Sequence, residues 1–119
     1  MLVSRLMSGC VELQKCATQD SAHVLEGASG DHVARIQRAL VVIDVADIDE
    51  AEIRARRFGP TTSREVLKYK TRRNIVNPSY QTRPDAIVGK MTIASLDREM
   101  AAREATSPMA NVTRTGALY

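Results

Sequence analysis

The chain has 119 residues, of which 44% are hydrophobic and 26% are charged, and its formal net charge is +3. This length and composition are typical of one small globular domain with a modest single core. No apolar run approaches the roughly 18 residues that a membrane-spanning helix needs, and the first ten residues lack the apolar stretch of a signal peptide.

Residues 1–24 are expected to form an N-terminal extension with one short helix over CVELQKCA. Cys10 and Cys16 are too few for a disulfide framework, and no histidine lies close enough in sequence to complete a zinc site with them. We therefore expect two small, half-buried thiols, and we expect neither a bound metal nor a cofactor.

A longer helix is predicted from Asp31, which is a good N-cap residue. Apolar residues recur in it at steps of three or four: Val33, Ile36, Leu40 and Ile43. In the following segment, 41–57, Asp49 is predicted to cap a short helix that ends at Arg57 and carries Ile53 on its inner side.

The next helix is predicted to begin at GPTTSREVLKYKTRR, because Pro60 lacks an N–H that the first helical turn would leave unpaired. Thr62 and Glu65 have the spacing of a capping box, although Gly59, Thr61 and Thr62 all remain candidates for the cap. The residues expected to line its inner face are Val66, Tyr69 and the stem of Arg73.

A polar loop with two short extended pieces, NIV and AIV, precedes the last helix, which is predicted over residues 90–104. Its apolar contacts are expected to be Met91, Ala94, Leu96 and Met100. Residues 101–119 are predicted to be a helix tail followed by a linker, since Thr, Ser, Pro and Gly punctuate them.

The last two helix starts repeat one pattern, G-x-x-T-x-x-x-apolar, at residues 59–66 and 89–96. Glycine suits a tight turn where a side chain would collide or where φ must be positive. The threonine hydroxyl can then satisfy an N–H group of the first helical turn, and the apolar residue enters the core. We predict two equivalent turn-to-helix entries packed around a shared core.

Three blocks, in order, resemble the peptidoglycan-binding domain family, a three-helix module appended to many bacterial and phage wall hydrolases. The first block matches at Leu25, Gly27, Gly30, Val33, Ile36, Gln37 and Leu40. The second matches at Phe58, Gly59, Pro60, Thr62, Val66 and Tyr69, and the third at Asp85, Val88, Gly89, Thr92 and Leu96.

This resemblance spans residues 25–96 and implies an all-α fold, a small three-helix bundle at residues 25–100. Beyond the family module, the residues themselves predict an extra short helix in the 41–57 insertion, a helical extension at 1–24, and a tail at 101–119. The chain departs from the family pattern at Tyr69-Lys70, where the family has Phe-Gln, at Ala86, where it has Gly, and in longer loops at 41–57 and 74–84.

The resemblance further implies a non-catalytic module that binds peptidoglycan, through its glycan or its stem peptide. Such a module tethers a fused or associated protein, such as a hydrolase or a secreted effector, to the wall. The candidate ligand-binding residues are polar residues on loops near the repeated turns: Arg57, Thr61, Asn74, Tyr80, Gln81 and Arg83. The implied site of action is the bacterial cell wall or periplasm. Because no signal peptide is visible, we expect synthesis in the cytoplasm and export by another route or within a larger protein.

We do not expect an enzyme. His23 and His32 lack the spacing of a metal-binding pair, and neither a G-x-S-x-G turn nor a nucleotide-binding loop is present. The acidic residues cluster in one local run, which we interpret as a solvated turn and helix start: Asp44, Asp47, Asp49, Glu50 and Glu52.

Basic residues dominate 54–73, and three interpretations of them stay open: a surface for a carboxylate-bearing wall ligand, a nucleic-acid surface, and a solvated face balanced by the acidic run. Only this segment favours nucleic acid, which is therefore not an expected partner. An alternative function is a protein–protein adaptor on the same scaffold, docking secretion or phage cargo without binding glycan. The 41–57 insertion and the missing signal peptide favour that alternative.

Overall fold

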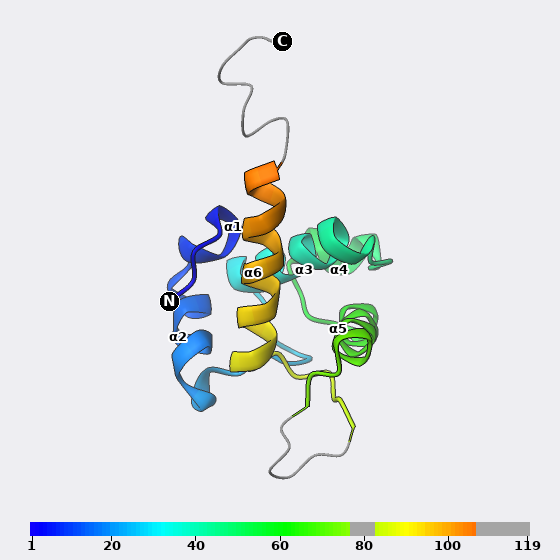
Figure 1. Cartoon of the computed structure of the whole chain (residues 1–119). Helices are drawn as coiled ribbons and strands as arrows, with labels where there is room; N and C mark the ends of the chain where they lie inside the picture. The colour runs from blue at the N-terminus through cyan, green and yellow to red at the C-terminus, as the bar shows by residue number, and fades with distance from the viewer. Residues whose placement is uncertain (77–82, 107–119) are drawn as a thin grey trace, which may run out of the picture.

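A computed structural model gives the fold of the chain, and it describes residues 1–76 and 83–106 (Figure 1). Its elements are α1 (Arg5–Ser8), α2 (Val11–Thr18), the 3₁₀ turn η1 (Asp20–Ala22), α3 (Asp31–Asp44), α4 (Glu50–Ala55), α5 (Pro60–Arg73) and α6 (Lys90–Thr106). Within these ranges the regular elements are all helices, which confirms the predicted all-α class. No helix in the described ranges combines the length and the apolar character that crossing a membrane requires.

The predicted apolar face of α3 is confirmed, because its four recurring apolar residues are all buried. The predicted cap was wrong, since Gly30 is the N-cap and Asp31 is the first helical residue, where its carboxylate accepts from Arg35. Asp49 caps α4 as predicted, since its carboxylate accepts a hydrogen bond from the Ala51 amide at 3.3 Å. Two details of α4 were wrong. The helix ends at Ala55, because Arg56 adopts a left-handed conformation with φ of 53°. Ile53 is 42% exposed, and Glu52 is the residue that α4 turns inward.

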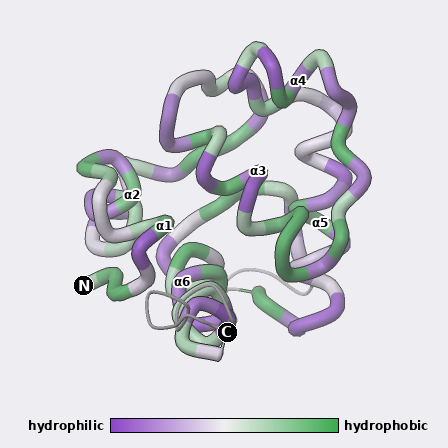
Figure 2. Tube along the Cα trace, turned by 90° about the horizontal axis from the view of Figure 1, so that it is seen from above, coloured by the Kyte–Doolittle hydropathy of each residue, from purple (hydrophilic) through white to green (hydrophobic). Residues whose placement is uncertain are grey.

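Helix α6 begins at Lys90 as predicted, but the predicted inner face was partly wrong. Leu96 and Met100 are buried, whereas Met91 and Ala94 are exposed and Ile93 is buried. The reason is the position of α6, which contacts α1 and α2 as well as α3. Figure 1 shows α6 with α1 and α2 on one side and α3 on the other, and Figure 2 shows α6 end-on. Contact with several helices widens the buried face of α6, so that it includes polar residues.

The N-terminal segment shares the core with α3 and α6. Its buried residues are Leu2, Met7, Cys10, Leu13 and Cys16. The amides of Val3 and Ser4 donate to the buried carboxylate of Asp97, at 2.8–3.1 Å. The amides of Arg5 and Leu6 donate to Glu104, at 2.7 and 3.1 Å. Polar residues of α6 therefore hold the start of the chain through its backbone.

Both cysteines are free, and each is buried rather than half-buried as expected. Burial raises the pKa of the Cys16 thiol to about 11. Its Sγ lies 3.4 Å from the carbonyl oxygen of Val88, to which it donates. These thiols therefore act as small apolar core groups in the folded chain.

A strap formed by residues 24–30 joins the two repeated turns. Val24 and Val88 exchange backbone hydrogen bonds at 2.9 and 2.8 Å. Farther along the strap, the Phe58 amide donates to the carbonyl of Ala28 at 2.8 Å. Phe58 and Val88, the residues before the two repeated glycines, are both fully buried. The prediction that both turn-to-helix entries pack around one core is thus confirmed, with Val66 and Leu96 buried below them.

Candidate functional site

The first repeated turn is built around the carboxylate of Glu52. Its Oε1 accepts from the amides of Gly59 and Thr62 and from the Thr62 hydroxyl, and its Oε2 accepts from the amide and hydroxyl of Thr61, all at 2.6–3.1 Å. Burial alone would raise the pKa of Glu52, but these hydrogen bonds outweigh it and lower the pKa to about 2. The first turn of α5 therefore binds an ionised carboxylate that the chain itself supplies.

This arrangement corrects the predicted capping box. Gly59 is the N-cap and provides no side chain, while the Thr62 hydroxyl donates to Glu52 instead of accepting from the helix. Glu65 pairs with Arg64 and Lys68 at 3.0 and 3.2 Å. A Cβ at Gly59 would lie 2.6 Å from the Glu52 carboxyl carbon, so glycine is required here for the close approach of the carboxylate.

The second repeated turn has the corresponding amides and threonine, but it lacks the Thr61 hydroxyl and such an acceptor. Thr92 is 2% exposed, and its hydroxyl has no hydrogen-bond partner within residues 1–76 and 83–106. Within the same ranges, no side chain accepts from the amides of Gly89, Met91 or Thr92. A Cβ at Gly89 would lie 3.1 Å from Nε2 of His23, so an imidazole stands near the turn.

A cavity of about 300 Å³ lies at this second turn. The lining of this cavity includes the second turn and the charged and polar side chains around it: His23, Lys70, Asp85, Gly89, Lys90 and Thr92. Lys70 is 5% exposed, and its Nζ donates to the Asp85 carboxylate and to the carbonyl of Ile87, each at 2.7 Å. Lys90 pairs with Asp20 at 3.2 Å. The cavity thus combines free helix-start donors with two ammonium groups that acidic residues partly neutralise.

The structure divides the predicted ligand-binding residues between the two ends of α5. Arg57 and Thr61 line a hollow of about 650 Å³ at its start, where the Thr61 hydroxyl also accepts from the Asp49 amide at 2.9 Å. Asn74 caps the other end in a left-handed conformation.

Fourteen helical residues rise about 20 Å, so Asn74 does not share a site with Arg57 and Thr61. Arg83 is exposed on the segment that leads to the second turn. Tyr80 and Gln81 lie outside the described residues. The cavity residues Lys70 and Thr92 were not predicted as ligand-binding, although the repeated pattern already marked the position of Thr92.

Acidic residues pair with much of the basic segment 54–73. Arg54 pairs with Glu50 at 2.7 Å, and both Arg72 and Arg73 contact Asp44, at 3.1 and 3.0 Å. This pairing favours the interpretation of a solvated face balanced by the acidic run. It leaves fewer unpaired cations for phosphate groups than the sequence suggests.

Arg73 joins three helices at the far end of α5. Its guanidinium donates to both oxygens of Asp44 at 3.0 Å and to both oxygens of Glu99, and it stacks 3.8 Å from the centre of the Tyr69 ring. The Tyr69 hydroxyl bonds with Ser95 and donates to Glu99, at 2.7 and 2.8 Å. Hydrogen bonds from Arg73 lower the pKa of Glu99 despite its partial burial.

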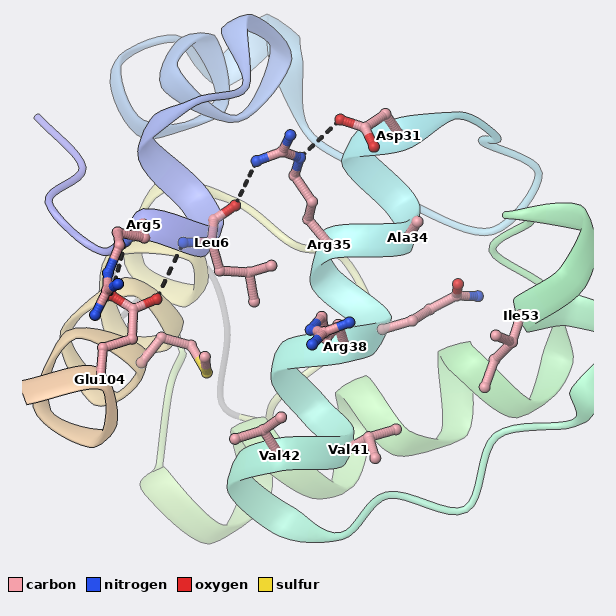
Figure 3. Close-up of a pocket in the computed structure, with 12 residues that line it drawn as sticks. Arg5, Leu6, Asp31, Ala34, Arg35, Arg38, Val41, Val42, Ile53 and Glu104 are labelled. Carbon is pink, nitrogen blue, oxygen red and sulfur yellow. Dashed lines mark hydrogen bonds and ion pairs between the residues drawn. The ribbon is translucent and has the colours of Figure 1, made fainter. Parts of the chain in front are cut away.

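A larger hollow of about 950 Å³ follows α3, between α1 and α6 on one side and α4 on the other (Figure 3). Val41, Val42 and Ile53 are each about 40% exposed along it. Arg35 is engaged, since it donates to Asp31 and to the carbonyl of Leu6 at 2.7 Å. Arg38 is exposed, with no ion pair to another described residue. This α3 groove therefore joins an apolar surface to an available cation.

Comparisons of the chain with protein families, with curated proteins and with solved structures found no match.

Proposed function

We propose that this chain is a non-catalytic module of peptidoglycan-binding type, which tethers a fused or associated protein to the bacterial cell wall. The supporting observation is that the three sequence blocks behind the resemblance meet in space. The strap 24–30, from the first block, pairs with the backbone beside both repeated turns, at Phe58 and at Val88. The open cavity at the second turn provides a place for a polar ligand.

The acidic run supports a binding role over a catalytic one. The carboxylate of Glu52 holds the start of α5, and its pKa of about 2 makes it a weak base. Asp44 at the other end of the run is bonded to Arg73. Both side chains are thus committed to holding helices together.

Co-sedimentation with washed, protein-free sacculi tests this function. We expect the protein to pellet at physiological salt, and we expect muramidase digestion of the sacculi to release it. Replacing Tyr80 and Arg83 together by Ala should weaken pelleting several-fold, because both are predicted ligand-binding residues that precede the second turn in sequence. Arg98→Ala is the matched control, since Arg98 is an exposed arginine on the outer face of α6. Protein that stays in the supernatant at both low and physiological salt would overturn the proposal.

A protein-docking function is the second candidate, and the α3 groove favours it. Exposed β-branched side chains in a shallow groove are typical of surfaces that receive another apolar element. Arg38 at its rim is available to pair with a carboxylate. The matching partner is an amphipathic helix that carries apolar residues on one face and an acidic residue at the edge of that face.

Two variants separate specific docking at this groove from nonspecific hydrophobic binding. Val42→Asp and Arg38→Glu should each prevent the immobilised protein from capturing a partner with such an amphipathic helix. Val11→Asp should retain it, because Val11 is equally apolar and 65% exposed but lies on α2. Equal capture by all four proteins would exclude the α3 groove as a docking site.

A further inference from the structure

The first repeated turn shows what a Gly-x-x-Thr helix start can bind in this fold. Its donors surround one carboxylate, that of Glu52, with five hydrogen bonds. Amides at a helix N-terminus and nearby hydroxyls favour an anion of this shape, because they are fixed donors at the positive end of the helix dipole. The turn is thus a carboxylate site that an acidic side chain of the chain fills.

The second turn repeats the Gly-x-x-Thr pattern thirty residues later. Among the described residues no carboxylate accepts from its amides, and the imidazole of His23 lies beside Gly89, with Nε2 3.1 Å from the position of a Cβ there. Asp85, an acid close to it in sequence, accepts instead from the Ile87 amide at 3.1 Å and from Lys70. Thr92 is 98% buried with an unpartnered hydroxyl, and it lines the cavity. Among the described residues the buried side-chain oxygen or nitrogen without a partner is Gln37 Oε1, so the Thr92 hydroxyl keeps some access to the cavity, where a ligand can reach it.

The differences between the two turns suit an external ligand. Lys90 stands where the first turn has Pro60, and it adds an ammonium group at the mouth of the cavity. Met91 replaces Thr61, which removes one hydroxyl donor. The cavity volume of about 300 Å³ is at the lower end for small-molecule sites and fits the end of a peptide.

We propose that the cavity at the second turn binds the free carboxylate of a short peptide. The amides of Met91 and Thr92, with the Thr92 hydroxyl, hold the carboxylate as their counterparts in α5 hold Glu52. Lys90 and Lys70 contribute positive charge, and Asp20 and Asp85 limit it, so the helix-start donors carry the recognition. The identification of this peptide as a peptidoglycan stem rests on the wall-binding function proposed above. The binding of a carboxylate at the second turn is independent of that function.

Titration of the ¹⁵N-labelled full chain, followed by NMR, tests the site. The probes are N-acetyl-D-alanine, N-acetyl-L-alanine and the neutral N-acetyl-D-alaninamide. We expect saturable shifts of the Met91 and Thr92 amide signals with an acid and none with the amide. Thr92→Val should weaken binding about tenfold, because it removes one charge-assisted hydrogen bond. Thr106→Val, at the other end of α6, should leave binding unchanged.

Thr92→Val should also leave the melting temperature nearly unchanged, since the Thr92 hydroxyl makes no hydrogen bond to the described residues of the free protein. A folded variant with unchanged affinity would therefore overturn the assignment of Thr92. Equal shifts with acid and amide, or no shift at residues 89–92, would overturn the site.

The two alanine enantiomers distinguish the source of the carboxylate. Preference for the D form supports a wall stem peptide, and preference for the L form supports the C-terminus of an ordinary peptide. Carboxylate binding without pelleting on sacculi would uphold the site and reject the wall function. Pelleting without carboxylate binding would support the wall function and reject the carboxylate site.

Discussion

Glu52→Ala is expected to lower the free energy of unfolding by about 3 kcal/mol, and the melting temperature by roughly 12 °C. The substitution leaves the amides of Gly59, Thr61 and Thr62 without their acceptor at a buried helix start. Urea denaturation followed by circular dichroism measures the effect. Glu50→Ala is the matched control, because Glu50 is two residues away, exposed, and paired with Arg54 at the surface. Equal losses in the two variants would contradict the structural role of Glu52.

The same carboxylate makes stability depend on pH in a predictable direction. The pKa of Glu52 is about 2 in the folded chain against 4.5 ordinarily, so its ionised form stabilises the fold above pH 4.5. That contribution, about 3 kcal/mol, is lost as the pH falls from 4.5 towards 2. The pKa values of Asp44, Glu65 and Glu99 are also lowered, so other carboxylates lose stability in acid as well. The difference between the native chain and Glu52→Gln isolates Glu52, and it should shrink towards zero near pH 2.

Arg73→Met is expected to cost about 2 kcal/mol of unfolding free energy. It leaves Asp44 and Glu99 facing each other without the guanidinium between them, and it removes the contact with the Tyr69 ring. We place the effect below that of a fully buried pair because the Arg73 side chain is 23% exposed, so solvent screens part of it.

Arg72→Met is the comparison for this cluster, since Arg72 contacts the same Asp44 at 3.1 Å from a side chain that is 57% exposed. We expect it to change stability by less than about 0.5 kcal/mol. Arg73→Lys should restore only part of the loss, because an ammonium group cannot donate in parallel to both carboxylates or stack on the ring as guanidinium does. Similar values for Arg72→Met and Arg73→Met would mean that the cluster does not join the helices.

Local patterns were sufficient to predict the helices α3, α5 and α6, because α3 carries an apolar period, Pro60 occupies the first turn of α5, and a glycine precedes α5 and α6. The predictions of the buried helix faces were wrong where contacts with segments distant in sequence determine which side of a helix is buried. Asp97 is 5% exposed because it binds the backbone of the first residues, and no periodicity in α6 indicates such a partner.

Glu52 shows why the candidate site was only half predictable. It stands in a run of acids that looks solvated, and its partners come from a turn seven to ten residues later. Sequence reasoning found the repeated turn but assigned its threonine an acceptor role, because local capping rules compare only residues within one helical turn. In the structure the Thr62 hydroxyl is a donor, because the carboxylate of Glu52 from α4 lies beside it and accepts its hydrogen bond.

The bonds from Val3 and Ser4 to Asp97 also constrain the order of folding during synthesis. Their partners are separated by more than ninety residues, so the ribosome must deliver α6 before the start of the chain can dock. Until then Met7 and Leu13, both fully buried in the finished fold, have no complete core to enter. Contacts of such long sequence separation slow folding. The nascent N-terminal segment is therefore the part of this protein most exposed to chaperones and proteases before release.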